Sequence, residues 1–206
     1  MAWLIMIAIV GLLLVGNELW SRRKNLHEEF SRKFIHISVG CLVAFWPWWL
    51  SWTEIRWLSV AFLAGVGLSK LLGVFQALHS VQRPTWGEFF FAISVGGLTF
   101  LTHNKWIYAT ALLQMALADG LAAVIGVRYG NGQGYSVFGH RKTLIGTLVF
   151  LLTSMIILVW YQAASGANIS IIKLDFIALL ASAIENLAVA GFDNLLVPLV
   201  VVALLR

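Results

Sequence analysis

The chain has 206 residues, of which 60% are hydrophobic and 11% are charged. Soluble domains carry about 25% charged residues, so this composition excludes a soluble domain. The formal charge of +5 includes no basic run of the kind that binds nucleic acid, and the single cysteine, Cys41, excludes an internal disulfide.

The apolar residues come in blocks close to the roughly 20 residues that cross a bilayer as a helix, with short polar stretches between them. The blocks lack the alternation of a transmembrane barrel strand, and helices satisfy their own backbone in lipid. We therefore predict an all-α protein, a single transmembrane helical bundle over residues 1–206. The predicted spans are 2–20, 34–50, 55–75, 89–103, 106–127, 144–162 and 174–191, with 194–205 as a candidate eighth.

The basic residues predict the orientation of the bundle. Loops 21–33, 70–88 and 128–143 hold ten Lys and Arg residues, whereas the opposite loops hold three. Because short cytoplasmic loops are enriched in Lys and Arg, these three loops are predicted to face the cytoplasm, with the N-terminus outside. The first block has no preceding basic residue and no clear cleavage site, so we expect it to be a retained helix.

Three basic residues begin the second predicted span. Arg32 and Lys33 lie four and three residues before His36, so all three occupy adjoining faces of a helix. We expect them to converge on an anion. The alternative for Arg32 and Lys33 is ordinary positive flanking of a span, whereas His36 lies deeper in the apolar run.

The loop over 82–88 contains Arg83, Thr85 and Glu88. Thr85 and Glu88 have the spacing of a helix capping box, which would give them a purely structural role. Arg83 and Glu88 are alternatively candidates for positioning a ligand.

Asp119 lies inside a predicted span among small residues. Ala118, Ala122 and Gly126 follow one another at four-residue spacing, which allows close helix packing. Packing alone needs no carboxylate, so we predict that Asp119 is functional and that its partner is a cation or a metal ion.

The segment over 131–147 is rich in glycine and leads through Lys142 and Thr143 into a span. Backbone amides, a lysine and a helix N-terminus can together cradle phosphates. The spacing is not that of a Walker A loop, and a flexible loop with a basic stop is the alternative.

Two further acidic residues lie near the C-terminus. Glu185 is inside a predicted span and Asp193 follows eight residues later, a distance of about two helical turns that would place both on one side of a helix. Together with Asp119 they give three carboxylates on a face that also carries basic residues. Carboxylates for Mg²⁺ and cations for phosphate oxygens are the parts that phosphoryl transfer needs.

These segments, in this order, resemble the motifs of the CTP-dependent isoprenoid-alcohol kinases, the family of dolichol, phytol and farnesol kinases. The similar motifs are Arg-Lys-x-x-His at 32–36, Asp-Gly-x-Ala-Ala-x-x-Gly at 119–126, Lys-Thr-x-x-Gly at 142–146, and Glu185 followed by Asp193-Asn194. The resemblance implies transfer of a phosphoryl group from CTP to the hydroxyl of a membrane isoprenoid alcohol, with Mg²⁺ as cofactor, a nucleotide-binding region at 119–146 and no nucleic-acid partner.

The resemblance also implies roles for individual residues. The implied catalytic residues are Asp119, His36, Lys142, Glu185 and Asp193, with Asp119, Glu185 and Asp193 as metal ligands. The implied nucleotide-binding residues are Arg32, Lys33, Gly120, Gly126, Arg128, Gly130, Arg141, Lys142, Thr143 and Gly146. Arg83, Thr85, Glu88 and Asn194 are expected to position the substrate or the loops. The expected location is a multi-pass protein of a prokaryotic inner membrane, with the active site on the cytoplasmic face.

Two alternatives remain at this stage. The nucleotide-binding half of the chain also resembles phosphatidate cytidylyltransferase. The Lys-Asp and Pro-Gly-His-Gly-Gly motifs of that family are, however, missing after residue 150. The second alternative is a small proton-coupled or cation-coupled transporter that uses Asp119, Glu185 and His36. A conduction path needs polar groups on both sides of the membrane, and the opposite side offers only Glu54 and Asp175.

Overall fold

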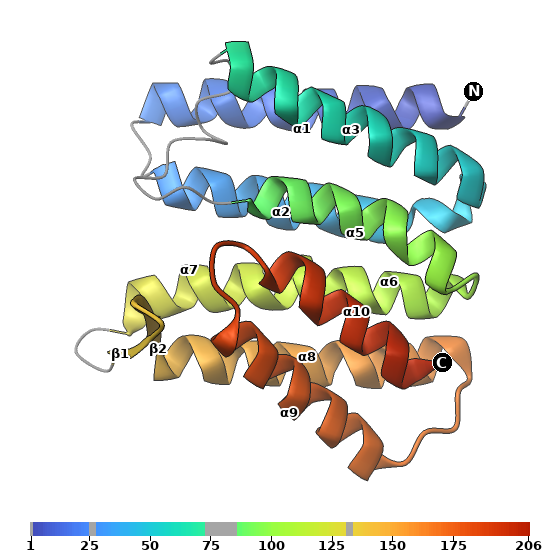
Figure 1. Cartoon of the computed structure of the whole chain (residues 1–206), viewed down its shortest axis with the longest axis vertical. Helices are drawn as coiled ribbons and strands as arrows, with labels where there is room; N and C mark the ends of the chain where they lie inside the picture. Colours follow the sequence, from blue (N-terminus) through green and yellow to red (C-terminus); the bar gives the residue numbers. More distant parts are fainter. Residues whose placement is uncertain (1, 25–27, 73–85, 131–133) are drawn as a thin grey trace.

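The computed structural model describes residues 2–24, 28–72, 86–130 and 134–206. Over these residues the chain is a bundle of helices that run back and forth between two ends (Figure 1). The helices are α1 Ala2–Lys24, α2 Glu28–Ala44, α3 Trp52–Leu72, α5 Gly87–Leu101, α6 Lys105–Leu113, α7 Asp119–Tyr129, α8 Leu144–Ser165, α9 Ile171–Leu187 and α10 Asp193–Leu205, with a short 3₁₀ turn, η1, at Trp46–Trp48.

Within the described ranges, three helical stretches are long and apolar enough to cross a membrane. They are Ala2–Ser21, Lys105–Tyr129 and Leu144–Ser165, and they coincide with the predicted spans 2–20, 106–127 and 144–162. Helices α2, α5, α9 and α10 have 17, 15, 17 and 13 residues. At 1.5 Å per residue they reach about 20–26 Å, which is less than the roughly 30 Å hydrocarbon core. The count of seven or eight spans therefore stays a prediction.

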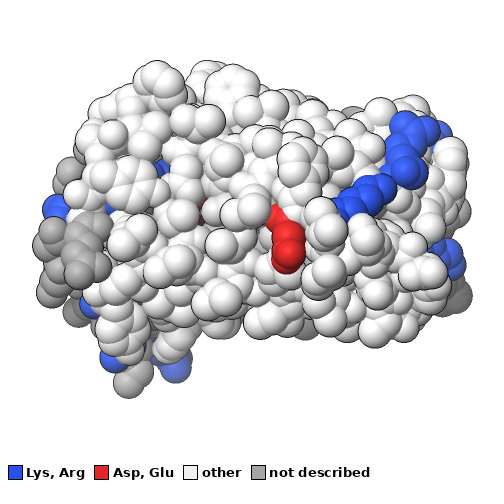
Figure 2. All heavy atoms as spheres, turned by 90° about the horizontal axis from the view of Figure 1, so that it is seen from below, with Lys and Arg blue, Asp and Glu red and all other residues white. Residues whose placement is uncertain are grey.

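The charged side chains are few on the face formed by the lower side of the bundle in Figure 1. Lys and Arg lie toward its two ends, and an exposed acidic side chain lies in the middle among uncharged residues (Figure 2). The C-terminal ends of α1 and α7, the N-terminal ends of α2 and α8 and the strands between α7 and α8 lie together at the left end (Figure 1). This end carries the described parts of the loops at 21–33 and 128–143, two of the three loops that were predicted to share one side of the membrane.

The structure is helical as predicted, apart from one short hairpin. The segment before α8 forms an antiparallel hairpin of β1 (Gly134–Val137) and β2 (His140–Thr143), in which Tyr135 pairs with Lys142. Its two-residue turn is Phe138-Gly139, with φ angles of 47° and 77°. Positive φ at both central positions matches the right-handed twist of paired strands, and this geometry makes a tight hairpin of what was predicted to be a loop.

The expectation that Glu185 and Asp193 share one helix was wrong. Helix α9 ends at Leu187 and α10 begins at Asp193, because the chain reverses through Ala190 and Gly191, whose φ values are 55° and 92°. The reversal nevertheless returns Asp193 to the end of the bundle where α9 stops (Figure 1).

Helices α6 and α7 are continuous through a π-helical segment, η2 Gln114–Ala118. Two glycines bring this part of the bundle against α2. A Cβ on Gly40 would lie 2.2 Å from the Cβ of Ala116, and a Cβ on Gly120 would lie 2.2 Å from the Cγ1 of Ile37. This close approach places α2 directly beside the residue that begins α7, which is Asp119.

Candidate active site

A buried ion pair joins α2 to α7. The Nζ of Lys33 lies 2.7 Å from Oδ2 of Asp119, and the two side chains are 12% and 7% exposed. The pair depends on the close approach of the two helices at Gly40 and Gly120. The prediction that Asp119 has a cationic partner is thus met by Lys33.

His36 lies on the same face of α2 as Lys33. Its Nε2 is 3.7 Å from Oδ2 of Asp119 and 3.1 Å from the carbonyl oxygen of Met115 in the π-helical segment. A carbonyl only accepts hydrogen bonds, so this geometry assigns the proton to Nε2 and leaves the lone pair of a neutral ring on Nδ1. Two of the three residues predicted to converge on an anion, Lys33 and His36, therefore do so on Asp119.

A second ion pair joins the hairpin to α9. The Nζ of Lys142 donates to Oε1 of Glu185 and, at 2.9 Å, to the backbone carbonyl of the same residue. Burial alone would lower the pKa of Lys142, but the carboxylate of Glu185, together with Asp193 and Asp119, outweighs that effect and raises the pKa above its usual value. Lys142 is therefore a cation over the whole neutral range.

The two ion pairs belong to one cluster of charges. Asp119 interacts electrostatically with Lys142 as well as with Lys33, and Asp193 interacts with Asp119 and with both lysines. Asp193 also accepts a hydrogen bond, 3.1 Å long, from the backbone N–H of Asn194. Five separate elements, α2, α7, β2, α9 and α10, thus bring two cations and three carboxylates together.

The residues of this cluster fit a magnesium ion that arrives with a nucleotide. Within the described residues, no three His, Cys, Asp or Glu side chains are close enough to form a metal cage by themselves. Protein sites for Mg²⁺ commonly supply one or two carboxylates and leave the other positions to water and substrate phosphates. Asp119, Glu185 and Asp193 are able to meet that smaller requirement.

Tyr135 links the hairpin to helices α8 and α9 through hydrogen bonds. The hydroxyl of Tyr135 donates to Oδ1 of Asn186 on α9 and lies 2.6 Å from Oγ1 of Thr147 on α8, which itself bonds to Asn186 at 3.0 Å. Sequence reasoning missed this network. Its only available signal was the position of Asn186 directly after Glu185.

Thr143 and the glycines around it have a structural role. The side chain of Thr143 is the N-cap of α8 and accepts a hydrogen bond, 3.1 Å long, from the N–H of Gly146. A Cβ on Gly126 or on Gly130 would lie 2.7 or 2.6 Å from an atom of Thr143, and one on Gly146 would lie 3.0 Å from the carbonyl of Ala122. These glycines let α7 pack tightly against the start of α8.

Other predicted site residues lie away from the charge cluster. Arg128 and Arg141 are exposed, and the Arg128 guanidinium stacks over Tyr129. Arg141 and Lys142 are neighbours in a strand, so their side chains leave opposite faces, and Arg141 does not accompany Lys142. Arg83 and Thr85 lie outside the described residues. The capping box of Thr85 and Glu88 therefore stays a prediction, and the described part of α5 begins after Trp86 at its N-cap position.

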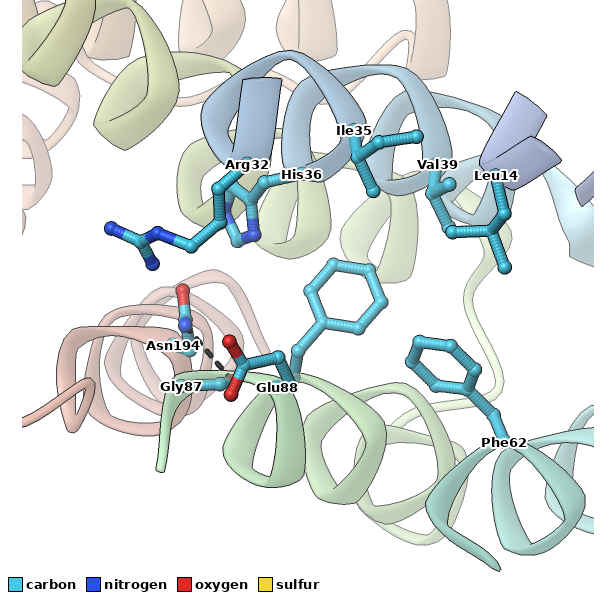
Figure 3. Close-up of a pocket in the computed structure, with 10 residues that line it drawn as sticks. Leu14, Arg32, Ile35, His36, Val39, Phe62, Gly87, Glu88 and Asn194 are labelled. Carbon is cyan, nitrogen blue, oxygen red and sulfur yellow. Dashed lines mark hydrogen bonds between the residues drawn. The ribbon is translucent and has the colours of Figure 1, made fainter. Parts of the chain in front are cut away.

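The remaining predicted residues line a crevice on the other side of His36. Arg32, Glu88 and Asn194 form its polar end together with His36 (Figure 3). Apolar side chains from α1, α2, α3 and α5 form the other end. Sequence reasoning did not predict the crevice, because no pattern in one segment indicates that five helices leave a space between them.

Comparison with known proteins identifies relatives. No protein-family profile and no solved structure matches the chain. The chain is 35% identical to phytol kinase of Synechocystis sp. over 92% of its own length and 84% of the relative. It is 29% identical to probable phytol kinase 2, chloroplastic, of Glycine max, covering 92% of the chain and 68% of the relative. A shorter match, 34% identical over 42% of the chain and 17% of the relative, is dolichol kinase of Saccharomyces cerevisiae.

The chain is an apolar helical bundle with paired lysines and carboxylates at one end. The relatives named above are kinases, so the chain falls in the class of membrane kinases. The chain belongs to the isoprenoid-alcohol kinase family.

Proposed function

We propose that the protein transfers the γ-phosphoryl group of CTP to the hydroxyl of a membrane isoprenoid alcohol, giving the prenyl monophosphate and CDP. The observation that carries the proposal is the joining of the Lys33–Asp119 and Lys142–Glu185 ion pairs in one cluster beside an amphipathic crevice. The membership in the isoprenoid-alcohol kinase family supports the class of acceptor.

In this reaction the hydroxyl oxygen attacks the γ-phosphorus, and the bond between that phosphorus and the β,γ-bridging oxygen breaks, so that CDP leaves. Lys33 and Lys142 offer ammonium groups to the phosphate oxygens, where negative charge is greatest during transfer. The hydroxyl proton passes to Nδ1 of His36 or to one of the carboxylates, because Nε2 of His36 faces the carbonyl of Met115.

Asp119, Glu185 and Asp193 are the residues that would hold Mg²⁺, which supplies charge neutralisation on the β- and γ-phosphate oxygens when bound. The segment 119–146 is the proposed nucleotide-binding region. Within it, the hairpin places Lys142 beside the end of α9 and the glycines bring α7 against α8.

We further propose a multi-pass protein of a prokaryotic inner membrane, with seven or eight spans, the N-terminus outside and the charge cluster on the cytoplasmic side. The excess of basic residues in the loops at that end supports this orientation. CTP would then reach the cluster from the cytoplasm while the alcohol stays in the bilayer.

The test is an assay of the purified protein in detergent with Mg²⁺, with γ-labelled CTP or ATP, and with prenols of several lengths or phosphatidic acid. We expect label in a prenyl monophosphate with CTP as the preferred donor. Label from ATP in place of CTP would overturn the donor, and formation of CDP-diacylglycerol from phosphatidic acid would overturn the reaction. A protein that forms no lipid product and is not stabilised by CTP would be a transporter candidate.

A further inference from the structure

The crevice beside His36 has two chemically different ends. Ten residues line a small space of about 50 Å³ that is partly open to the surroundings, so it has room for the head of a ligand but not for the whole of one. Arg32, His36, Glu88 and Asn194 lie at one end, and Leu14, Phe62 and Phe91 lie at the other (Figure 3). Such a division suits a ligand with a small polar head and a hydrocarbon tail.

The polar end contains a donor and an acceptor that the protein does not satisfy. Nε of Arg32 and Oδ1 of Asn194 are both buried and have no hydrogen-bond partner among the described residues. The Nδ2 of Asn194 donates to the carbonyl of Gly87 at 3.0 Å, which directs its Oδ1 toward α2, where Arg32 and His36 lie (Figure 3). Buried polar atoms are nearly always paired with protein, water or ligand groups, so these two atoms are available to a polar group of a ligand.

A hydroxyl group satisfies such a pair, because it can accept one hydrogen bond and donate another. A carboxylate or phosphate head would only accept, and it would leave the oxygen of Asn194 unsatisfied. The orphaned pair therefore favours an alcohol over a lipid with an anionic head.

The polar end also meets the charge cluster directly. His36 lines the crevice and lies 3.7 Å from Oδ2 of Asp119, and Asn194 follows Asp193, which interacts with that carboxylate. A hydroxyl held between Arg32 and Asn194 would thus lie next to the groups proposed to handle the phosphates.

The apolar end is built on aromatic rings. The ring of Phe91 packs edge-on against His36, with centroids 5.4 Å apart, and against Phe62 of α3 at 5.9 Å. Leu14 of α1 stands opposite Phe62 across the space (Figure 3). Phe91 is 4% exposed and fixed in the core, whereas α1 and α3 each contribute a single residue to the crevice.

We infer that this crevice is the binding site of the alcohol, with the hydroxyl between Arg32 and Asn194 and the first isoprene units between Phe91, Phe62 and Leu14. Leu14 and Phe62 then determine which alcohol tails are accepted. The inference rests on the proposed kinase function for its ligand, but the site itself is defined by the geometry.

The first test fills the apolar end with a larger side chain. Leu14→Trp is expected to raise the KM for the alcohol about 10-fold or more while the KM for CTP stays unchanged, since a few misplaced methylenes are worth that much in an apolar pocket. The matched control is Leu12→Trp, the same change two residues away on α1 at a position that is 73% exposed. Equal alcohol KM values for the two variants would overturn the inference.

The second test enlarges the same end. Phe62→Ala is expected to shift the ratio of kcat/KM values toward alcohols with bulkier or longer tails, and Phe100→Ala, at a position that is 68% exposed, is the control. An unchanged preference in Phe62→Ala would count against the assignment even if Leu14→Trp failed to fold.

A binding measurement separates the inference from the kinase function. A prenol that carries a photoactivatable group on its second isoprene unit is expected to label residues of α1, α3 or α5 that line the crevice, with competition by unmodified prenol and loss of labelling in Leu14→Trp. Labelling of the crevice residues without any turnover would contradict the proposed kinase function and leave the inferred binding site standing. Turnover with labelling confined to the outer, lipid-facing surface would contradict the crevice as the alcohol site and leave the kinase function standing.

Discussion

Lys33 and Asp119 are 86 positions apart in the chain, yet the Nζ of Lys33 lies 2.7 Å from Oδ2 of Asp119 with both side chains largely buried. Each charge is costly inside an apolar bundle without the other. The pair therefore links the folding of α2 onto α7 to the formation of the charge cluster.

Removing the lysine alone should destabilise the protein strongly. Lys33→Met leaves the carboxylate of Asp119 buried without its hydrogen-bonded cation, and loss of one partner of a buried pair costs about 3–5 kcal/mol. Thermal unfolding in detergent should show a large fall in Tm for Lys33→Met and a partial recovery in the double variant with Asp119→Asn. A double variant no more stable than Lys33→Met would contradict this account.

The carboxylate of Asp119 should matter more for catalysis than the imidazole of His36. Phosphoryl transfer has a loose transition state that needs little help from a base, whereas it depends on electrostatic stabilisation. Asp119→Asn is expected to lower kcat at least about 100-fold, and His36→Ala clearly less. A series in which His36→Ala abolishes turnover and Asp119→Asn spares it would reverse the two roles.

The close approach of α2 to the π-helical segment should be sensitive to one methyl group. Gly40→Ala places a Cβ 2.2 Å from the Cβ of Ala116, and neither group can rotate away, so we expect a loss of about 1–3 kcal/mol and of activity. Ala116→Gly in the same chain should restore both. The control is Gly97→Ala, in α5, where nothing lies within 4 Å of the added Cβ and stability should be unchanged or slightly higher.

Loss of the Tyr135 hydroxyl should weaken binding of the nucleotide and leave binding of the alcohol unchanged. Tyr135→Phe removes the hydroxyl bonded to Asn186 and Thr147, each bond being worth about 1 kcal/mol. The KM for CTP is expected to rise about 5-fold with the alcohol KM unchanged. A rise in the alcohol KM instead would remove the hairpin from the nucleotide-binding region.

The contribution of Lys142 to stability should persist to high pH. Its pKa is higher in the folded protein than the ordinary 10.5, so the stabilisation is fully present below that value and is lost as the pH rises through the folded pKa. The difference in Tm between the wild-type protein and Lys142→Met should stay constant from pH 7 to about 10 and then shrink. A difference that already declines below pH 9 would contradict the ion pair with Glu185.

The sequence predicted best where local spacing determines geometry. The positions of Lys33 and His36 on one helical face follow from their three-residue separation, and the burial of Asp119 follows from the apolar block around it. The crossing point of α2 and α7 was not predictable, since Gly40 and Gly120 lie in different segments and neither shows which helix will approach it.

The elements that were missed are short and depend on one or two residues. The hairpin lacks the usual Asn-Gly turn, and Phe138 adopts a positive φ that few residues of its type do. The break between α9 and α10 depends on Ala190 and Gly191, and alanine ordinarily continues a helix. The crevice itself depends on side chains from α1, α2, α3, α5 and α10 at once, which no spacing within one segment encodes.

The position of the crevice also sets the way in which the acceptor is supplied. Among the residues that line the crevice, α1 contributes Leu14 and α3 contributes Phe62. These two helices lie at one edge of the bundle, so in a membrane the apolar end of the crevice would lie next to lipid (Figure 1). An acceptor that reaches its site from this edge arrives by diffusion in two dimensions. The rate then follows the mole fraction of alcohol in the membrane, and adding inert phospholipid at a fixed amount of alcohol slows the enzyme by dilution alone.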